Sequence, residues 1–480
     1  MSLPTEVLLM AFKYMTKPDL KKLRLVCKQY SNAAIPVLYD KVFLSTNRAD
    51  AEVTVLIIRH FAPYVKTLIF SSVLYDYMTY AQWRKRYGQR KRSFNTQREK
   101  DDFIAHCQYV YENYFIIRQE LQEDIRSGVC LAHLCRALQG LPNLRKVIVT
   151  DGGPSTCEIT SSSRESSSRG LWRKTDPCLV ADCKLSNNEH LRYQMLPNSG
   201  FLSLVVNPWE MLQLAMWTTS RVIEDISVQP DISVQKNGRG LGQNGPYLPD
   251  LLMPNPYRPY EICDVMRNLT KFRLDVYYEG NYESDPYSKV DFAGPLSAAT
   301  NLKALYLGFT SVYEFIFEGQ YRIFLGFLRN CRLPNLESLI LSHINSTAEE
   351  LLSFLRESRQ LRQLTLQPHR LYSSTWEAVA NELRGLKSLK SVQLTELKGG
   401  WSEDSMASFD AKEYDMLHGA YQDVFGDVEG FLFRNEPNPF TETAMTQYFN
   451  DLVLGTRPIK PHDGQGVRLP GPETRYKLFH

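Results

Sequence analysis

The sequence predicts an α/β chain in which an N-terminal three-helix unit precedes an irregular strand–helix solenoid with insertions. Three observations lead to this fold class. Apolar residues recur at helical spacing over residues 1–45. A short apolar motif typical of a strand then recurs between residues 65 and 394, and helical patterns fill the gaps between its last copies. We therefore expect a helical unit at 1–45, a repeat domain at 46–400, and a cap with a tail at 401–480.

The composition narrows the class of protein. Of the 480 residues, 43% are hydrophobic and 23% are charged, which is typical of a globular chain and excludes a collagen-like or wholly disordered one. The 56 Lys and Arg residues nearly balance the 53 Asp and Glu residues, and a net charge of +3 argues against a dedicated binder of nucleic acid or membrane surfaces. No apolar run approaches the ~18 residues of a membrane helix.

Two further features favour a reducing compartment, in the cytoplasm and/or the nucleus. The N-terminus lacks the basic region that opens a secretory signal. The nine cysteines show no close-spaced framework of the kind that disulfide-rich secreted domains carry.

Residues 1–45 predict three short helices. The first carries one apolar face, and the second begins at Pro18, whose missing N–H is harmless in a first helical turn. A third helix is expected over residues 28–34. A unit of this size is too small to be very stable alone, so it should lean on the rest of the chain or on a partner. The apolar positions of the first two helices are Val7, Leu8, Ala11, Phe12, Met15, Leu20, Leu23, Val26 and Cys27.

The recurring motif reads apolar, two residues, apolar, one residue, apolar, and its second and third positions alternate as in a short strand. The last spacings between copies, 25 and 28 residues, fit a leucine-rich repeat, and longer spacings imply insertions. The copies are Val65-Leu68-Phe70, Leu144-Val147-Val149, Ile223-Ile226-Val228, Leu269-Phe272-Leu274, Leu302-Leu305-Leu307, Leu336-Leu339-Leu341, Leu361-Leu364-Leu366 and Leu389-Val392-Leu394.

Between the late copies two helices are expected, each opened by a capping box. They cover residues 347–358 with Ser346 and Glu349, and residues 376–384 with Ser374 and Glu377. Strand and helix alternating at this period predict a solenoid in which each unit buries its apolar face against its neighbours.

The expected insertions lie at about 84–126, 151–200 and 230–260. The second contains a Ser-rich tract, and the third is rich in Gly and Pro without periodicity, so both predict loops. Residues 401–430 carry eight acidic side chains against one basic side chain, a local net charge of −7.

Several fixed offsets in the first 40 residues resemble the F-box family. That family's motif opens with Leu-Pro and an acidic residue, continues with an apolar helix and an Asp-Leu pair, and reaches Val-Cys followed by a basic residue. Tyr30 stands where the family usually has Trp, and Ile35 to Tyr39 resemble an extension common in fungal F-box proteins. The matching residues are Leu3-Pro4, Glu6-Val7-Leu8, Asp19-Leu20, Leu23 and Val26-Cys27-Lys28.

The resemblance implies docking to the Skp adaptor of a cullin–RING ubiquitin ligase, with a target protein held by the degenerate leucine-rich repeats. The chain would then be an adaptor subunit without catalytic residues, cofactor or metal. The expected adaptor-binding residues are Leu3, Pro4, Glu6, Val7, Leu8, Leu20, Leu23, Val26 and Cys27. The expected target-binding residues, on the exposed strand side of the repeats, are Lys303, Tyr306, Gln363, Thr365, Lys390 and Gln393.

Two alternatives stay open. One is an F-box scaffold that acts outside the ligase. The other is a nucleic-acid binder that uses the basic cluster at 84–92, where Trp83 and Tyr87 are interleaved with six basic residues. The segment Gly240-Leu-Gly242-Gln-Asn-Gly245 matches the glycine spacing of a dinucleotide-binding site. It lacks the strand before it and the helix after it that such a site needs, so we expect a loop there.

Overall fold

In the computed structural model the chain divides into two compact units. Unit 1 comprises Met1–Ala299 and Thr310–Phe315, and unit 2 comprises Thr300–Phe309 and Ile316–His480. The secondary structure mixes helices with parallel strands, which confirms the α/β class. The structure describes residues 3–46, 48–71, 96–150, 208–229, 259–278, 293–311, 331–372, 375–394, 397–399, 428 and 430–441. The basic cluster at 84–92, the Ser-rich tract and residues 401–427 lie outside the described residues.

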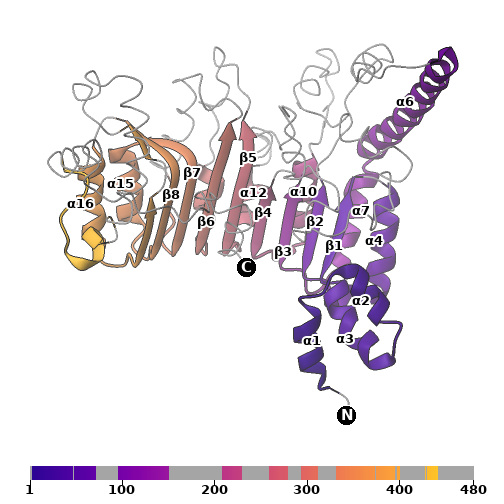
Figure 1. Ribbon diagram of the computed structural model, residues 1–480, viewed down its shortest axis with the longest axis horizontal. Coiled ribbons are helices and arrows are strands. Elements are labelled where there is room, and N and C mark those ends of the chain that lie inside the picture. Colours follow the sequence, from indigo (N-terminus) through magenta and orange to yellow (C-terminus); the bar gives the residue numbers. More distant parts are fainter. Residues whose placement is uncertain are drawn as a thin grey trace. The chain divides into compact units, whose positions relative to one another are not determined.

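Unit 1 contains a parallel sheet whose strands follow one another in chain order (Figure 1). Parallel neighbours need a crossover connection, and helices supply it. The strands are β1 (Lys41–Ser45), β2 (Thr67–Ser71), β3 (Lys146–Thr150), β4 (Asp225–Gln229) and β5 (Lys271–Tyr278).

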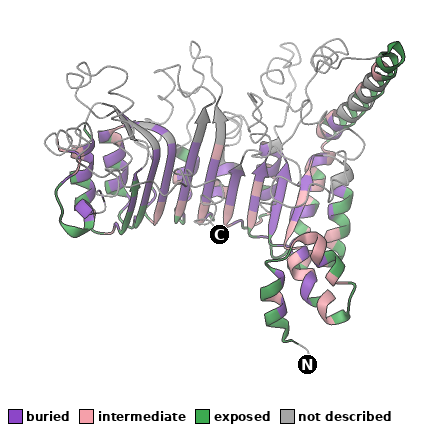
Figure 2. Ribbon diagram, in the orientation of Figure 1, coloured by how far each residue is buried: buried purple, intermediate pink, exposed green. Residues whose placement is uncertain are grey.

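The motif residues of neighbouring copies lie side by side in this sheet. Leu68 pairs with Val147, Val147 with Ile226, and Ile226 with Phe272. All four side chains are buried. β1 adds a copy that the sequence reading missed, because Val42 pairs with Leu68 and is equally buried. The ladder of equivalent apolar positions is therefore the core of unit 1, as the purple strands of Figure 2 show.

The helices of unit 1 pack beside one another along one side of the sheet, with α4 against α7, α7 against α10, and α10 against α12. Another helix, α6, projects away from this layer in Figure 1 and has 30 residues inside the expected insertion at 84–126. After the N-terminal three, described below, the helical segments are α4 (Arg48–Phe61), η1 (Ala62–Tyr64), α6 (Gln97–Arg126), α7 (Val129–Gly140), α10 (Pro208–Thr218), α12 (Pro259–Met266) and α13 (Ala293–Ser297).

Unit 2 repeats the same plan. Its strands are again parallel, and β8 pairs with β7 on one side and with both β9 and β10 on the other. Leu305, Leu339, Leu364 and Val392 form one ladder of paired, buried positions. The elements are β6 (Ala304–Ser311), β7 (Ser338–Thr347), α15 (Ala348–Glu357), β8 (Gln363–Tyr372), α16 (Trp376–Gly385), β9 (Ser391–Leu394) and β10 (Leu397–Gly399).

The face of the unit 2 strands opposite the leucine ladder is more buried than the sequence predicted. The expectation that Tyr306 and Thr365 are exposed is wrong, since they are only 2% and 8% accessible. The ring of Tyr306 lies over Gly308, where an added Cβ would stand 2.7 Å from its Cε1 atom. Parallel strands are commonly buried on both faces, and the burial of these two side chains fits that pattern.

The other four expected target-binding residues are exposed, but two of them are not in strands. Gln363 and Gln393 stand on β8 and β9, whereas Lys303 and Lys390 stand in the turns just before β6 and β9. The exposed cations therefore belong to the edge where the strands begin.

The N-caps of both unit 2 helices lie one residue later than expected, although α16 begins at Trp376 as predicted. The capping box of α15 joins Thr347 and Glu350, because Ser346 is the buried end of a strand that runs on to Thr347. The N-cap of α16 is Thr375, whose hydroxyl accepts a hydrogen bond from the Ala378 N–H at 3.2 Å. Ser374, the expected cap, lies outside the described residues.

Residues 430–441 pack against α16. The side-chain amide of Asn438 donates to the Asn381 amide oxygen at 3.0 Å, and Arg384 lies 4.8 Å above the ring of Phe431. Among the described helices, none combines the length and the apolar character that crossing a membrane requires.

Candidate functional site

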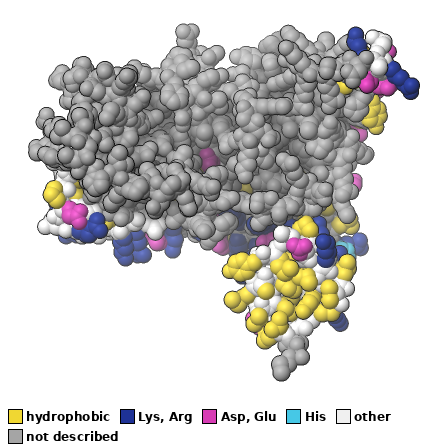
Figure 3. Space-filling model, in the orientation of Figure 1, with side chains coloured by type: hydrophobic (Ala, Val, Ile, Leu, Met, Phe, Trp, Pro, Cys, Tyr) yellow, Lys and Arg dark blue, Asp and Glu magenta, His cyan; other side chains and the backbone are white. Residues whose placement is uncertain are grey.

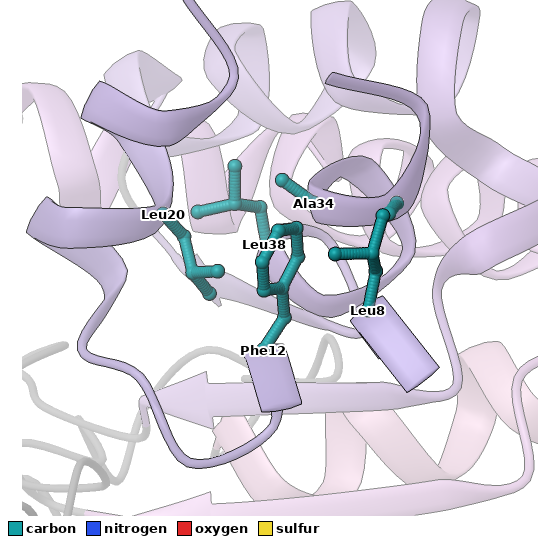
Figure 4. Close-up of a cluster of buried hydrophobic side chains, with 6 residues drawn as sticks. Leu8, Phe12, Leu20, Ala34 and Leu38 are labelled. Carbon is teal, nitrogen blue, oxygen red and sulfur yellow. The ribbon is translucent and has the colours of Figure 1, made fainter. Parts of the chain in front are cut away.

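The three N-terminal helices share one small core. α1 (Thr5–Phe12) contributes Leu8 and Phe12, which are four residues apart and so lie on one helical face. α2 (Lys17–Leu23) contributes Leu20, and α3 (Lys28–Leu38) contributes Ala34 and Leu38 (Figure 4). A core of this size contributes modest stability, so the helices depend on their caps and on the adjoining strand.

This core corrects two of the expected adaptor-binding residues. Leu8 and Leu20 are 3% and 1% exposed, so their side chains hold the helices together and are not available to a partner. Tyr30, in the place where the F-box motif has Trp, supports the same core with an edge-on contact to the Phe12 ring at 6.0 Å.

A second set of apolar side chains on these helices faces outward. We name this set the apolar face; Figure 3 shows it as the yellow surface of the N-terminal helices. Exposed apolar residues concentrated in this way mark a docking surface, because water-facing hydrocarbon is stabilised by burial against a partner. Its members, with their exposed fractions, are Leu3 54%, Val7 46%, Met10 65%, Tyr14 92%, Met15 37%, Leu25 79% and Val26 66%.

The expected adaptor-binding residues divide accordingly. Leu3, Pro4, Glu6, Val7, Val26 and Cys27 are exposed, and Leu23 is partly buried against the core. The expected adaptor-binding set lacked four members of the apolar face, which are Met10, Tyr14, Met15 and Leu25. The helical spacing of Val7, Met10 and Tyr14, which are three and then four residues apart, is the signal that could have found two of them.

Local hydrogen bonds fix the shape of the apolar face. The side-chain amide of Gln29 on α3 donates to the backbone carbonyl of Leu3 at 2.7 Å, which ties the segment before α1 to the third helix. Thr16 caps α2, since its hydroxyl oxygen accepts a hydrogen bond from the Asp19 N–H at 3.4 Å. Leu3 and the start of α2 are thereby held in place before any partner arrives.

The three helices are joined firmly to the first strand of unit 1. α3 runs on through Pro36 to Leu38, so the expected end at residue 34 is wrong. A guanidinium nitrogen of Arg24 donates to the Tyr39 hydroxyl at 3.2 Å, and the Tyr39 ring stacks on Phe61 at the end of α4 with centroids 3.8 Å apart. These contacts couple the end of α2, and the exposed Leu25 beside it, to α4 and the start of the sheet in unit 1.

The ionised carboxylate of Asp40, at this junction, is destabilised by partial burial. Burial raises its pKa above the ordinary 3.8, although Lys41, Lys17 and Lys66 oppose the shift. Folding therefore favours protonation of Asp40 relative to the unfolded chain, so the stabilising effect of the proton is complete below pH 3.8 and is lost as the pH rises through the raised pKa.

We expect Asp40→Asn to be more stable than the wild type at pH 7, because it removes the partly buried charge and its amide oxygen can still accept the Lys41 N–H. Thermal unfolding of both proteins between pH 4 and pH 7 measures this. The difference should shrink toward pH 4. A less stable Asn variant at pH 7 would mean that the three lysines outweigh the cost of burial.

The described cysteines do not form a metal site. No group of three or more His, Cys, Asp or Glu side chains with suitable geometry is present in the part of the chain that the structure describes. Cys130 is buried and its thiol donates to the Thr46 carbonyl at 3.1 Å, while burial raises the pKa of the Cys135 thiol.

Comparison with protein families agrees with this geometry. A model of F-box-like domains matches residues 1–45, so the three helices with their apolar face are an F-box-like domain. A domain of this class indicates, at the general level, a substrate-adaptor role in an SCF-type ubiquitin ligase and binding to a Skp-type adaptor. Comparison with curated proteins finds no match.

Proposed function

We propose that this chain is the substrate-receptor subunit of a Skp–cullin–F-box ubiquitin ligase. The observation that carries the proposal is the apolar face on residues that match the F-box-like model. The Skp adaptor would cover that face and connect the chain to a cullin. Catalysis would lie in other subunits, and the chain would act in the cytoplasm, the nucleus or both.

The apolar face suits such docking for two physical reasons. Its members are exposed while their neighbours Leu8, Phe12 and Leu20 build the domain's own core, so a partner can bury them without unfolding anything. Pro4 and the Gln29 hydrogen bond to Leu3 restrict the segment in advance, which lowers the conformational entropy lost on binding.

We further infer that the strands and helices form a degenerate leucine-rich-repeat array that holds the target. A recurring backbone arrangement supports this. The carbonyl oxygen of one residue before a strand accepts hydrogen bonds from two consecutive N–H groups of the next copy, at 2.8 to 3.1 Å. The accepting residues include Lys66, Arg145 and Glu224 in unit 1, and Lys303, Glu337 and Arg362 in unit 2.

The array departs from regular leucine-rich repeats in one respect. The Asn that usually follows the strand motif by three residues is replaced after Leu341 by Ile344, which is buried. An apolar side chain packs at that position where an amide would normally bond to the backbone. The fungal type of the F-box is likewise part of our proposal, based on the residues from Ile35 to Tyr39.

Adaptor binding by the Leu3→Ala, Pro4→Ala double variant tests the proposed function. Calorimetric titration of the full chain with purified Skp adaptor should give tight wild-type binding. We expect the variant to bind about 30-fold more weakly, because truncating buried interface anchors typically costs ~2 kcal/mol or more. Exposed Leu3 and Pro4 do not support the helical core, so the melting temperature should not change. Wild-type protein that fails to bind the adaptor would overturn the proposal.

A further inference from the structure

The turns that lead into the unit 2 strands carry a row of exposed cations. We name this surface the strand-entry rim. In Figure 3 the row appears as dark-blue side chains along the lower edge at the left, below β6, β7 and β8 of Figure 1. Its members are Lys303, Arg332, Arg359, Arg362, Lys387 and Lys390, all exposed.

Backbone pairing places part of the rim in strict register. The Lys303 carbonyl accepts from the Glu337 N–H, the Glu337 carbonyl from the Arg362 N–H, and the Arg362 carbonyl from the Lys390 N–H, each at 2.8 Å. Four successive side chains therefore stand one strand spacing apart, and the row spans about 14 Å at ~4.8 Å per strand.

The charges along this row do not balance. Glu337 reaches Lys303 at 3.7 Å and Arg362 at 3.9 Å, so one carboxylate lies between two cations. Arg362 and Lys390 are then neighbours of like charge, with Arg359 and Lys387 in the same turns. Like charges on adjacent strands destabilise a sheet, and an anionic partner would remove that cost.

The matching edge of unit 1 carries two ion pairs between neighbouring strands. Arg145 lies 3.2 Å from Glu224, and Lys146 lies 3.0 Å from Asp225. Along the equivalent positions the net charge is +1 in unit 1, over Lys66, Arg145 and Glu224, and +2 in unit 2, over Lys303, Glu337, Arg362 and Lys390. The larger positive excess therefore lies in unit 2. The excess is a property of particular turns and does not follow from the repeat geometry alone.

We propose that the strand-entry rim binds an acidic segment of the target polypeptide. This proposal rests on the target-binding role given to the repeats above. Charge complementarity favours an acidic ligand. The row is as long as four to five extended residues, at ~3.3 Å each. Sites for single-stranded nucleic acid usually add aromatic side chains for base stacking, and residues 300–303, 331–337, 358–362 and 386–390 contain none.

A labelled 12-residue Glu-rich peptide tests the rim by fluorescence anisotropy with the full chain. The triple variant Lys303→Glu, Arg362→Glu, Lys390→Glu should bind about tenfold more weakly or worse. The matched control is Arg98→Glu, Lys100→Glu, Arg126→Glu on α6, which changes equally many exposed charges and should bind normally. Raising the salt from 50 to 500 mM should weaken wild-type binding, because screening shortens the range of the attraction.

A second variant gives the opposite sign, which misfolding cannot produce. Glu337→Gln removes the carboxylate that occupies Lys303 and Arg362, so it should strengthen peptide binding about two- to threefold. Equal losses in the triple variant and the α6 control would overturn the proposal, as would tighter binding of a single-stranded RNA of equal charge. Adaptor binding of the triple variant should stay normal, so failure of the rim is distinguishable from failure of the ligase role.

Discussion

Leu364→Ala should lower the free energy of unfolding by about 2–5 kcal/mol, the usual loss for a leucine truncated in a packed core. Leu364 is 1% exposed and stands in register between Leu339 on β7 and Val392 on β9. Each strand of an array touches its neighbours, so a cavity here weakens the coupling of three consecutive copies. Urea unfolding of the full chain, compared with the wild type, measures the loss.

Gln393→Ala is the matched control for that experiment. Gln393 pairs with Thr365 on the neighbouring strand, but its side chain is exposed, so its removal should cost less than about 0.5 kcal/mol. Equal losses at Leu364 and Gln393 would mean that the core face of these strands is assigned wrongly. The assignment of the exposed positions to target binding would fail with it.

The second large effect concerns the apolar face. The double variant Leu25→Asp, Val26→Asp should bind the Skp adaptor at least about 100-fold more weakly than the wild type. Both side chains are more than half exposed, so the change leaves the helical core intact. At an interface it would remove two apolar contacts worth about 1.5–3 kcal/mol each when fully buried, and would add two charges without partners.

Leu56→Asp is the control for nonspecific effects of an added charge. Leu56 is 57% exposed on α4, outside the F-box-like domain, and its replacement should leave adaptor binding unchanged. Titration of each variant with the adaptor, beside a thermal melt, separates binding from folding. Full-strength binding by the Leu25, Val26 variant would show that the adaptor docks elsewhere.

Much of the fold could be predicted from periodicity. Every apolar position of the recurring motif is buried, and equivalent positions pair within each unit. Burial against the equivalent side chain of the next strand removes each of these apolar side chains from water. The periodicity did not reveal the copy at Val42, because this copy directly follows α3. The first position of its motif is also Tyr39, an aromatic residue that stacks on Phe61.

Other features depended on contacts that sequence spacing cannot show. Tyr306 is buried because Gly308 leaves room for its ring, and an alternating pattern records only which face a residue occupies. In the F-box-like domain, the motif residues Leu8 and Leu20 pack in the core, while Met10, Tyr14 and Leu25 lie on the apolar face. The motif identifies the domain, but only the packing shows which residues form its core and which are exposed to a partner.

The central claim is tested most directly by affinity purification of the tagged full chain from cells, with the Leu25→Asp, Val26→Asp variant in parallel. Mass spectrometry should find a Skp adaptor and a cullin with the wild type, and neither with the variant. Adaptor without cullin would favour a scaffold that acts outside the ligase. Recovery of adaptor and cullin in equal amounts with wild type and variant, or of neither with both, would contradict docking through the apolar face.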